Sequence, residues 1–475
     1  MTWILEILAV AVPLFHIVGI GFAIHATLWS RTSQGAIAWG VSLVVMPYVS
    51  VPLYLVFGRA KFHGYVAERR AGDRRIDHVE RQLAGLMEAV KASPEGDVQR
   101  LGVLETLAGM PFTAGNSARL LVDGTDTFAA IFAAIEAAEK YVLVQFFIVR
   151  DDALGRELKT RLIAKAKAGV RVLFLYDEIG SIGLPHRYRR ELRAAGVAVA
   201  PFRTSRGLKN RFQINFRNHR KIVIIDGHAA FVGGHNVGVE YIGQCARFGH
   251  WRDTHVEVRG PAVGAIQLTF LRDWHWATGE IPELDWSLKR VEEDLRVLAV
   301  ATSPADDVES CTLLFLAAIS SARERVWITS PYFVPDETVF DALQLAALRG
   351  VDVRIMLPNK ADHLLVYLSA FSFLEAAERV GVKFYRYQAG FLHQKVMLID
   401  EKLASVGTAN MDNRSFRLNF EITVLCADSG FAKAVAGMLE RDFADCKRAT
   451  PGDLMRRGLV FRVAVRMARL FSPIQ

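Results

Sequence analysis

Residues 219–226 read HRKIVIID, a short apolar segment that carries three ionisable side chains. Four consecutive branched aliphatic residues favour a buried strand. Side chains alternate between the two faces of a strand, so His219 and Lys221 share one face, whereas Asp226 has the opposite parity and precedes a turn at Gly227. We interpret His219 and Lys221 as a working pair and Asp226 as a residue that fixes the strand.

The same pattern occurs a second time, in LHQKVMLIDE at residues 392–401, where His393, Lys395 and Asp400 keep the spacing of the first copy. Amphipathic helices alternate with apolar strands around both copies, which is typical of an α/β sheet with covered faces. The sequence therefore predicts two pseudo-symmetric α/β repeats, at residues 111–290 and 291–475. Two upstream segments are duplicated in the same order: AKAGVRVLFLYD (166–177) matches ALRGVDVRIMLPN (347–359), and AAGVAVAPF (194–202) matches RVGVKFYRY (379–387).

Polar residues downstream of the two strands match as well. GGHN ends at Asn236 and GTAN ends at Asn410, in each case seventeen residues after the histidine. Glycine lets the backbone approach a ligand closely, and asparagine offers amide donors. A single HxK pair is most simply an exposed edge strand, but two copies with equal downstream spacing favour one shared site. Two histidines, two lysines and two asparagines that converge would suit a phosphoryl group, whose transfer needs a nucleophile and several donors.

The N-terminal part contains two uncharged apolar runs, Ile7 to Trp29 and Ala36 to Phe57. Each exceeds the roughly 20 residues that cross a bilayer as a helix. A signal peptide should begin with basic residues, whereas Glu6 precedes the first run and no Lys or Arg occurs before Arg31. We therefore expect two transmembrane helices in residues 1–58. Basic residues follow the second run and predict that the rest of the chain is cytoplasmic: Arg59, Lys61, Arg69, Arg70, Arg74 and Arg75.

Residues 59–110 are charged and helical in composition, and we interpret them as a connecting segment with a break at SPEG, residues 93–96. The chain has 475 residues, of which half are hydrophobic, and a formal charge of +8. This length is enough for more than one compact unit. The cysteines include no CxxC pair, so the sequence predicts reduced packing residues and neither a zinc site nor a disulfide framework. They are Cys245, Cys311, Cys426 and Cys446.

Two basic segments allow more than one interpretation. The loop RTSRGLKNR has no counterpart in the second repeat, and it is either a solvated loop or a contact for anionic headgroups. Its basic residues are Arg203, Arg206, Lys209 and Arg211. The C-terminal segment 454–473 places three arginines on one helical face, so it is either a helix in a headgroup layer or a packed terminal helix with a charged outer face. These arginines are Arg462, Arg466 and Arg469.

Other residues near the motifs are weaker candidates. Core packing explains Tyr332 and Phe333 at least as well as a place near the pocket does. Three residues after the second asparagine are candidates for the pocket floor: Asp412, Arg414 and Ser415. No catalytic role is assigned to His235, His250, His255 and His363.

The doubled motif makes the chain resemble the phospholipase D superfamily, whose HxKxxxxD signature fits both copies. Within it the chain is most similar to bacterial cardiolipin synthases, by its two N-terminal apolar runs and four further motifs. These motifs are GGHNVGVEY (233–241), WRDTH (251–255), TSPYFVPDE (329–337) and GTANMDNRSFRLNFE (407–421). The resemblance covers essentially the whole chain. It implies two phospholipase D-like α/β/α sandwich repeats preceded by two transmembrane helices.

The resemblance also implies a two-step phosphatidyl transfer without a metal ion or another cofactor. One histidine attacks the phosphorus of a phosphatidylglycerol and releases glycerol, and a second phosphatidylglycerol then takes the phosphatidyl group to give cardiolipin. We expect His219 to attack and His393 to act as general acid and then as base. The implied catalytic residues are His219, Lys221, Asp226, His393, Lys395 and Asp400. The implied binding residues are Asn236, Asn410, Gly234, Thr408, Asp253 and Glu421, of which the last two would orient the imidazoles.

Three other functions fit parts of the pattern. A nuclease of the same superfamily would suit the basic charge, but two membrane helices disfavour a nucleic-acid partner. A membrane-bound phospholipase D would use water in the second step. A non-catalytic scaffold is disfavoured because both signatures are intact. We therefore expect a multi-pass protein of the bacterial inner membrane that acts on phosphatidylglycerol and other anionic phospholipids. The sequence leaves the acceptor lipid and the oligomeric state open.

Overall fold

The structure is a computed structural model, and it describes residues 2–58, 65, 74–92, 101–204, 215–360, 362–450 and 452–475. The chain divides into two compact units. The first contains residues 1–71 and 203–217, and the second contains residues 72–202 and 218–475. The N-terminal helices belong to the first unit, and the main β-sheet belongs to the second.

The N-terminal unit contains three apolar helices, α1 (Thr2–Trp29), α2 (Ser33–Val45) and α3 (Pro47–Phe57). Within α1, Ala9–Trp29 is long and apolar enough to cross a membrane. The second apolar run is not one helix, because it is interrupted at Met46. At 1.5 Å per residue α2 and α3 are about 20 and 17 Å long, each shorter than a hydrocarbon core of about 30 Å. The described residues thus contain one helix of spanning length, where the sequence predicts two.

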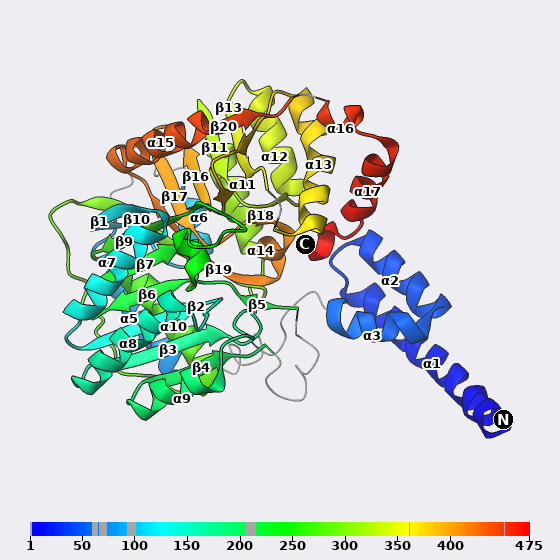
Figure 1. Cartoon of the computed structure of the whole chain (residues 1–475), viewed down its shortest axis with the longest axis horizontal. Helices are drawn as coiled ribbons and strands as arrows, with labels where there is room; N and C mark the ends of the chain where they lie inside the picture. Colours follow the sequence, from blue (N-terminus) through cyan, green and yellow to red (C-terminus); the bar gives the residue numbers. More distant parts are fainter. Residues whose placement is uncertain are drawn as a thin grey trace. The chain divides into compact units, whose positions relative to one another are not determined.

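The main sheet runs in the order β20-β14-β13-β11-β16-β17-β19-β10-β1-β9-β7-β6-β2-β3-β4 (Figure 1). One half contains β1 (Thr113–Val122), β2 (Tyr141–Phe146), β3 (Arg171–Asp177), β4 (Ala198–Phe202), β6 (Ile222–Ile225), β7 (Ala229–Gly233) and β9 (Thr254–Arg259). The other contains β10 (Leu295–Thr302), β11 (Arg325–Thr329), β13 (Asp352–Pro358), β14 (Lys383–Tyr387), β16 (Val396–Ile399), β17 (Leu403–Gly407), β19 (Asn419–Cys426) and β20 (Cys446–Arg448). Short strands are β5 (Arg217–Asn218), β8 (Trp251–Arg252), β12 (Phe333–Val334), β15 (Phe391–Leu392) and β18 (Met411–Asp412).

The two halves of the sheet repeat one topology. The order β4-β3-β2-β6-β7-β9-β1 of the first matches β14-β13-β11-β16-β17-β19-β10 of the second, and the halves join where β1 and β10 pair antiparallel. The two motif strands occupy equivalent places: β6 lies antiparallel between β2 and β7, and β16 lies antiparallel between β11 and β17. All residues of β6 and β16 are buried. The apolar part of each motif thus anchors it inside the sheet.

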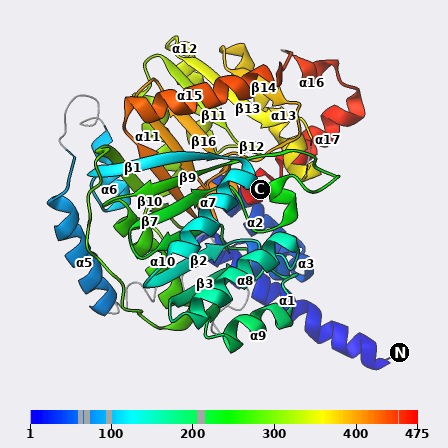
Figure 2. The ribbon, with the colours of Figure 1, turned by 60° about the vertical axis from the view of Figure 1, so that its left-hand side comes forward.

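Helices cover both faces of each half-sheet (Figure 2). In the first half, Val142 and Val144 of β2 pack with α7 and α8, whereas Tyr141 and Gln145 bond to side chains of α10. Alternation along the strand places these helices on opposite faces. In the second half, Val326 of β11 packs with α11 and α12, and Trp327 contacts Phe443 of α15. The helices are α7 (Asp123–Ala137), α8 (Ala153–Lys167), α9 (His186–Ala194), α10 (Val263–Thr278), α11 (Ser310–Ser321), α12 (Glu337–Leu348), α13 (Leu364–Arg379), α14 (Asn413–Arg417) and α15 (Ser429–Ala444).

The predicted connecting segment contains α5 (Arg74–Glu88) and α6 (Gly102–Ala108). The proposed break at residues 93–96 lies outside the described residues, as do Arg59, Lys61, Arg69 and Arg70 of the basic cluster. The chain ends in α16 (Asp453–Arg456), α17 (Leu459–Arg469) and a 3₁₀ turn, η4 (Ser472–Ile474). A further 3₁₀ turn, η3 (Val239–Ile242), follows GGHN.

Candidate active site

His219 directly follows the short strand β5 and lies three residues before the buried strand β6. Its Nδ1 is 3.0 Å from each carboxylate oxygen of Glu421 and 3.1 Å from the carbonyl oxygen of Thr408. All three atoms accept hydrogen bonds and cannot donate, so we assign the ring proton to Nδ1. Nε2 then keeps its lone pair and can act as a nucleophile or a base.

His393 directly follows β15, lies three residues before β16 and has an equivalent arrangement. Its Nδ1 is 2.7 Å from Oδ2 of Asp253, and its ring packs against Trp251 with the centroids 5.1 Å apart. The carboxylate again fixes the proton on Nδ1. Both histidine side chains are buried, with about one tenth of each exposed. The two imidazoles are thus oriented in the same way, each with Nδ1 directed to a carboxylate.

Each histidine is held by the other repeat. Glu421 is on β19 of the second half-sheet and orients His219, whereas Asp253 precedes β9 of the first half-sheet and orients His393. Backbone hydrogen bonds also cross between the repeats. The N–H of His219 donates to the carbonyl oxygen of Phe420, and the N–H of His393 donates to the carbonyl oxygen of Arg252. Neither repeat alone supplies both a motif histidine and the carboxylate that orients it. The site therefore exists only where the two repeats meet.

The lysines of both motifs are buried with the histidines. Each ammonium donates to the carbonyl oxygen of the histidine two residues before it, at 2.6 Å for Lys221 and 2.5 Å for Lys395. Lys395 Nζ also lies 2.9 Å from Nδ1 and 3.1 Å from Nε2 of His393. Lys221 Nζ instead lies over the ring of Phe147, 5.4 Å from its centroid. The two lysines thus share their place in the motif and differ in their contacts.

Burial shifts the ionisation of all four groups. It lowers the pKa of His219 to about 4, although Glu421 acts to raise it. Burial and the charges of Lys395 and Lys221 hold the pKa of His393 well below its usual value. Burial also lowers the pKa of Lys221 well below the usual range and that of Lys395 to about 8. Both imidazoles are therefore neutral near pH 7, and a negatively charged ligand would raise all four pKa values.

Glu421 stays ionised in this buried site. Burial acts to raise its pKa, but His219, Lys221 and the hydroxyl of Thr408 outweigh burial, so the pKa is lowered. Three further donors fix its carboxylate: Thr408 Oγ1 at 2.6 Å, Ser415 Oγ at 2.8 Å and Asn419 Nδ2 at 3.1 Å. Ser415 was a candidate for the pocket floor, and Asn419 was missed. Both residues lie shortly before Glu421 in NRSFRLNFE, and this closeness was the sequence signal that could have identified them.

The motif aspartates are not at the site. Asp226 accepts hydrogen bonds from the backbone N–H groups of Glu139, Lys140 and Tyr141, at 2.7–2.8 Å, at the start of β2. Asp400 accepts the N–H groups of residues 323–325 at the start of β11. Both have positive φ, 52° and 53°. They lie five residues, about 17 Å of strand, beyond the lysines. In the structure they fasten the motif strand to its neighbour, and a part for them in catalysis stays a prediction.

Four of the predicted binding residues lie beside the carboxylates that orient the histidines, or in the loops next to them. Thr408 bonds to Glu421 and His219, and a side chain added at Gly234 would overlap the carboxylate of Asp253. These two residues position the orienting carboxylates, and their contact with substrate stays a prediction. Asn236 accepts the N–H of Ile148 at 3.0 Å, and the N–H of Asn410 donates to Ser415 at 3.0 Å.

The residue between histidine and lysine also has a function in the fold. Arg220 forms a buried ion pair with Asp273 of α10 at 2.8 Å and donates to the carbonyl oxygens of Glu421 and Thr302. Its counterpart Gln394 donates to Asp442 of α15 at 2.8 Å. These contacts tie each motif to the helix behind it.

Asp362 was missed by the sequence analysis. It accepts the phenol of Tyr332 at 2.5 Å, and its charge acts to raise the pKa of both His393 and Lys395. It follows the strand equivalent to β3 after a short loop, and no motif marks it. Phe333, in contrast, is fully buried and packs against Phe373, as the core-packing interpretation predicts.

The remaining histidines and the basic loop have other surroundings. His235 and His255 are buried and contact each other through Nδ1, at 3.0 Å. His250 bonds to Asp123 at 2.8 Å, and His363 is exposed. In the basic loop, Arg206, Lys209 and Arg211 lie outside the described residues, so its two interpretations stay as they were.

Comparison with known proteins agrees with this geometry. Residues 131–245 and 315–443 match a family described as "Cardiolipin synthase, PLD-like domain". The chain is 50% identical over 462 residues to cardiolipin synthase A of Pseudomonas aeruginosa, with 97% of this chain and 94% of the relative covered. It is 48% identical over 469 residues to the protein of that name from Pseudomonas entomophila, with 98% and 97% covered. The fold resembles that of phosphatidylserine synthase from Haemophilus influenzae, with a TM-score of 0.60, 14% identity, and 79% of this chain and all of that chain covered.

Two paired histidine–lysine motifs on one fused α/β sheet define a phospholipase D-type phosphatidyltransferase. The chain belongs to the cardiolipin synthase family of PLD-like proteins.

Proposed function

We propose that the chain is a cardiolipin synthase, which transfers a phosphatidyl group from one phosphatidylglycerol to another and releases glycerol. The crossed pair of oriented histidines carries this proposal. His219 and His393 each present Nε2 with Nδ1 bonded to a buried carboxylate, as one nucleophile and one proton carrier require. The two relatives named cardiolipin synthase A, matched over nearly the whole chain, support the same activity.

In the first step, Nε2 of His219 attacks the phosphorus of a phosphatidylglycerol. A P–N bond forms and the bond from phosphorus to the glycerol oxygen breaks. That oxygen takes a proton from Nε2 of protonated His393 and leaves as glycerol. Because burial keeps His393 neutral near pH 7, the substrate's phosphate charge must first raise its pKa.

In the second step, the terminal hydroxyl of another phosphatidylglycerol attacks the same phosphorus. Its proton passes to Nε2 of His393, the P–N bond breaks, and His219 returns to its starting form. Lys221 and Lys395 stabilise the negative charge that gathers on the phosphoryl oxygens in both steps. Burial in this site strengthens that effect, because no bulk water screens it. Asn236 and Asn410 are proposed as further donors.

We also propose that the N-terminal helices cross the bacterial inner membrane twice. Pro47 has no N–H, so the Leu43 carbonyl lacks the donor that a continuous helix would supply. Gly19 of α1 lies against that carbonyl so closely that any side chain would overlap it. Membranes tolerate a broken helix where protein covers the freed group. α1 would form one crossing, and α2 with α3 the other.

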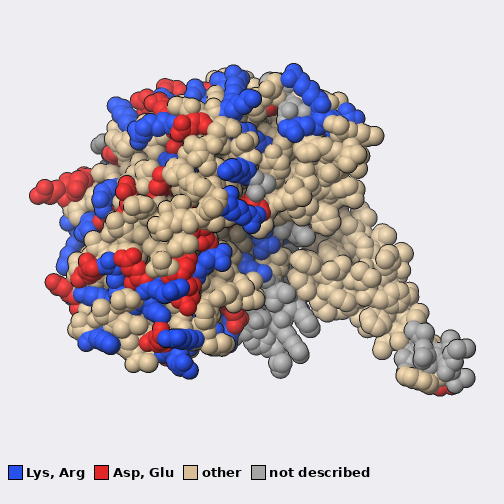
Figure 3. Space-filling view, in the orientation of Figure 1, with Lys and Arg blue, Asp and Glu red and all other residues tan. Residues whose placement is uncertain are grey.

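Two further observations support this topology. His25 of α1 bonds to the phenol of Tyr54 of α3 at 2.8 Å. The surface of α1–α3 in Figure 3 is almost free of charged residues, and apolar side chains such as Ile17, Leu28 and Ile37 are about two-thirds exposed. The catalytic repeats, at the boundaries 111–290 and 291–475, would lie in the cytoplasm. A cysteine in place of Ser33 should react with a membrane-impermeant maleimide added outside intact cells; reaction only after lysis would contradict this topology.

The activity is tested by incubating purified protein with phosphatidylglycerol and a chelator, and measuring cardiolipin and glycerol together. We expect both products in equal amounts, with the chelator present, and neither from the His219→Ala variant. Glycerol and phosphatidic acid without cardiolipin would favour a phospholipase D that uses water. Absence of all three products from the wild-type protein would overturn the proposal.

A further inference from the structure

The loops that follow β2 and β11 occupy equivalent places in the two repeats. In each repeat, the residue after the asparagine of GGHN or GTAN forms a parallel pair with this loop: Val237 with Val149, and Met411 with Phe333. Ile148 and Tyr332 directly precede the two paired loop residues, so they are equivalent. An apolar side chain in the first repeat is therefore replaced by a phenol in the second.

The phenol of Tyr332 donates a hydrogen bond of 2.5 Å to the carboxylate of Asp362, in the loop after β13. Burial and the charge of Asp362 hold the pKa of Tyr332 well above its usual value, so the phenol remains a donor. The other oxygen of Asp362 accepts the N–H of His363 at 2.7 Å. A carboxylate accepts about four hydrogen bonds, and the side chain of Asp362 is 18% exposed. It can therefore accept a further hydrogen bond from a ligand.

The corresponding loop of the first repeat, which follows β3, makes different contacts. There the hydroxyl of Ser181 accepts the N–H of Val149 and donates to the carbonyl oxygen of Phe147, both at 3.0 Å. This loop is thus fastened to backbone groups of its neighbour. The loop of the second repeat instead presents the carboxylate of Asp362.

The motif asparagines also differ in their hydrogen bonds. Oδ1 of Asn236 accepts the N–H of Ile148 at 3.0 Å. The N–H of Tyr332 instead lies 3.4 Å from Oγ of Ser330, and Oδ1 of Asn410 is buried with no hydrogen-bond partner among the described residues. A buried acceptor without a donor costs free energy. A ligand hydroxyl would supply the missing donor.

Asp362 lies at the edge of the sheet where His393 and Lys395 lie. Thr329, the last residue of β11, pairs with Val396, the residue after Lys395. Strand β13 runs parallel to β11, so the loop after β13 leaves the sheet at the same edge. The charge of Asp362 accordingly acts to raise the pKa of both His393 and Lys395.

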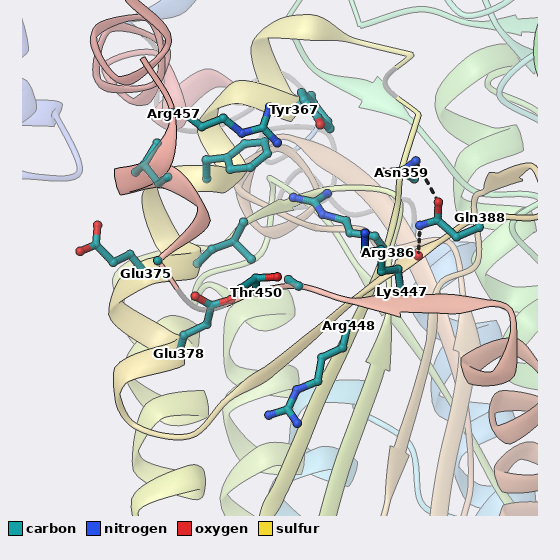
Figure 4. A pocket seen from close by; sticks show the side chains of 15 residues that line it. Asn359, Tyr367, Glu375, Glu378, Arg386, Gln388, Lys447, Arg448, Thr450 and Arg457 are labelled. Carbon is teal, nitrogen blue, oxygen red and sulfur yellow. Dashed lines mark hydrogen bonds between the residues drawn. The ribbon is translucent and has the colours of Figure 1, made fainter. Parts of the chain in front are cut away.

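The start of the loop that carries Asp362 is held in place. Asn359 directly follows β13, and its backbone N–H donates to the carbonyl oxygen of Tyr387 at 3.3 Å. Its side-chain amide donates to Oε1 of Gln388 at 3.2 Å, and Figure 4 shows these two side chains joined. Since Tyr332 holds the carboxylate at the other end of this short loop, the carboxylate has a defined position.

Both steps of the proposed reaction place glycerol near His393. In the first, an end oxygen of glycerol leaves phosphorus and takes a proton from His393. In the second, an end hydroxyl of another glycerol headgroup gives its proton to His393. In each case the next carbon carries the central hydroxyl of glycerol. An acceptor near His393 can therefore bind the same hydroxyl in both steps.

On the basis of this reaction, we propose that the carboxylate of Asp362 and Oδ1 of Asn410 form a subsite that recognises the central hydroxyl of glycerol. The leaving glycerol and then the acceptor headgroup occupy it in turn. Tyr332 is a positioning residue, because its phenol holds the carboxylate. The subsite selects a primary alcohol that has a hydroxyl on the next carbon. Water and simple alcohols lack that second hydroxyl, so they compete poorly for the phosphatidyl group.

Competition between two alcohols tests the subsite. The full chain in detergent at pH 7 receives phosphatidyl-p-nitrophenol as donor, with equal concentrations of glycerol and 1-propanol as acceptors. Phosphatidylglycerol and phosphatidylpropanol are measured at low conversion. We expect phosphatidylglycerol in about tenfold excess, because its acceptor hydrogen-bonds to a carboxylate. In the same assay 1,2-propanediol should compete as glycerol does, whereas 1,3-propanediol should compete as 1-propanol does.

Variants of the pair should change this ratio. Asp362→Ala should lower the excess of phosphatidylglycerol about fivefold, and Asp362→Asn should lower it less, because an amide oxygen still accepts without the charge. Tyr332→Phe should lower it about threefold, since the carboxylate loses the group that fixes it. Two controls should leave the ratio unchanged: Asp341→Asn, which alters an exposed carboxylate of α12, and Tyr385→Phe, which alters a tyrosine of β14 that packs against Phe443.

The ratio is independent of the amount of folded protein and of the charge on Lys395, since both alcohols compete for the same phosphatidyl-histidine. An unchanged ratio in Asp362→Ala would overturn the proposal, and so would an equal fall in the controls. Competition by 1,3-propanediol equal to that by glycerol would also overturn it. Cardiolipin formation from phosphatidylglycerol is measured separately: its absence would overturn the proposed function, whereas a wild-type ratio near one would overturn the subsite alone.

Discussion

The two halves of the active site contain the same motif on equivalent strands, but the carboxylates behind their histidines are held differently. Glu421 accepts hydrogen bonds from His219, Thr408, Ser415 and Asn419. Asp253 accepts the imidazole of His393 and the backbone N–H of Thr254. Glu421 is thus fixed from several sides, so His219 is the more rigidly oriented of the two imidazoles.

The two lysines also differ, but here the closer contact with the imidazole is in the second half of the site. Lys395 lies within 3.1 Å of both ring nitrogens of His393, whereas Lys221 bonds to the backbone of His219 and lies over Phe147. A nearby ammonium opposes protonation of His393 until a phosphate neutralises it. His393 is therefore the histidine whose proton affinity depends most on the ligand. This difference favours a fixed nucleophile at His219 and a proton carrier at His393.

The largest effect should come from removing either imidazole. His219→Ala and His393→Ala should each remain folded and lose cardiolipin synthesis, by about 10⁴-fold or more, because one loses the nucleophile and the other the proton carrier. The measurement is cardiolipin formed from phosphatidylglycerol.

A substrate whose leaving group needs no proton separates the two roles. With phosphatidyl-p-nitrophenol, His393→Ala should still release one equivalent of nitrophenol, and His219→Ala should release none. The reverse pattern would assign the nucleophile to the second repeat.

Replacing the orienting carboxylates should give the next largest losses of turnover, and the two losses should be unequal. Glu421→Gln should lower turnover by about 10⁴-fold, because a neutral amide no longer holds the proton on Nδ1 of the nucleophile. Asp253→Asn should cost about 10²-fold, since it affects proton transfer only. Single-turnover glycerol release measures the first step. Equal losses would remove the distinction drawn between the two halves.

The alkaline limb of the pH profile should report Lys395. The pKa of this lysine is about 8, and the ammonium is required in the transition state, so kcat/KM should fall above about pH 8. Asp362 acts to raise that pKa, so Asp362→Asn should move the limb to lower pH. The exposed Asp341→Asn is the matched control and should leave the limb in place. An unmoved limb in Asp362→Asn would mean that another group sets it.

The motif aspartates should affect stability more than chemistry. Asp226→Ala leaves three backbone N–H groups without their carboxylate acceptor and should lower the free energy of unfolding by about 2–4 kcal/mol. Asp226→Asn should cost less, because its amide oxygen still accepts and asparagine tolerates positive φ. Thermal unfolding in detergent measures both. Turnover of the folded fraction should stay near the wild-type value; a large loss at unchanged stability would return Asp226 to the catalytic set.

The sequence predicted much of this arrangement, because a doubled pattern carries information that a single one lacks. The repeated spacing from histidine to asparagine identified the two motif strands and the α/β repeats. The parity of Asp226 indicated a fixing residue, although the superfamily signature grouped it with the catalytic residues. Strand β6 is short, so the alternation of side chains between its two faces holds along its whole length.

What the sequence did not predict depends on contacts between distant segments. The resemblance implied that Glu421 and Asp253 orient the imidazoles but not that each acts across the repeats, and Asp362 had no motif. The antiparallel joint of β1 and β10 that fuses the half-sheets is set by edge pairing, which hydrophobic patterns do not encode. Pro47 marks the break in the second apolar run, whereas the length of the run alone predicted one helix.

Trapping the covalent intermediate tests the central claim most directly. Wild-type protein is mixed with phosphatidylglycerol labelled in the phosphatidyl group, quenched within the first turnover, and digested under conditions that preserve phosphohistidine. Mass spectrometry then locates the label. The difference between the two halves predicts a phosphatidyl group on His219 and none on His393. Label on His393 would contradict the account.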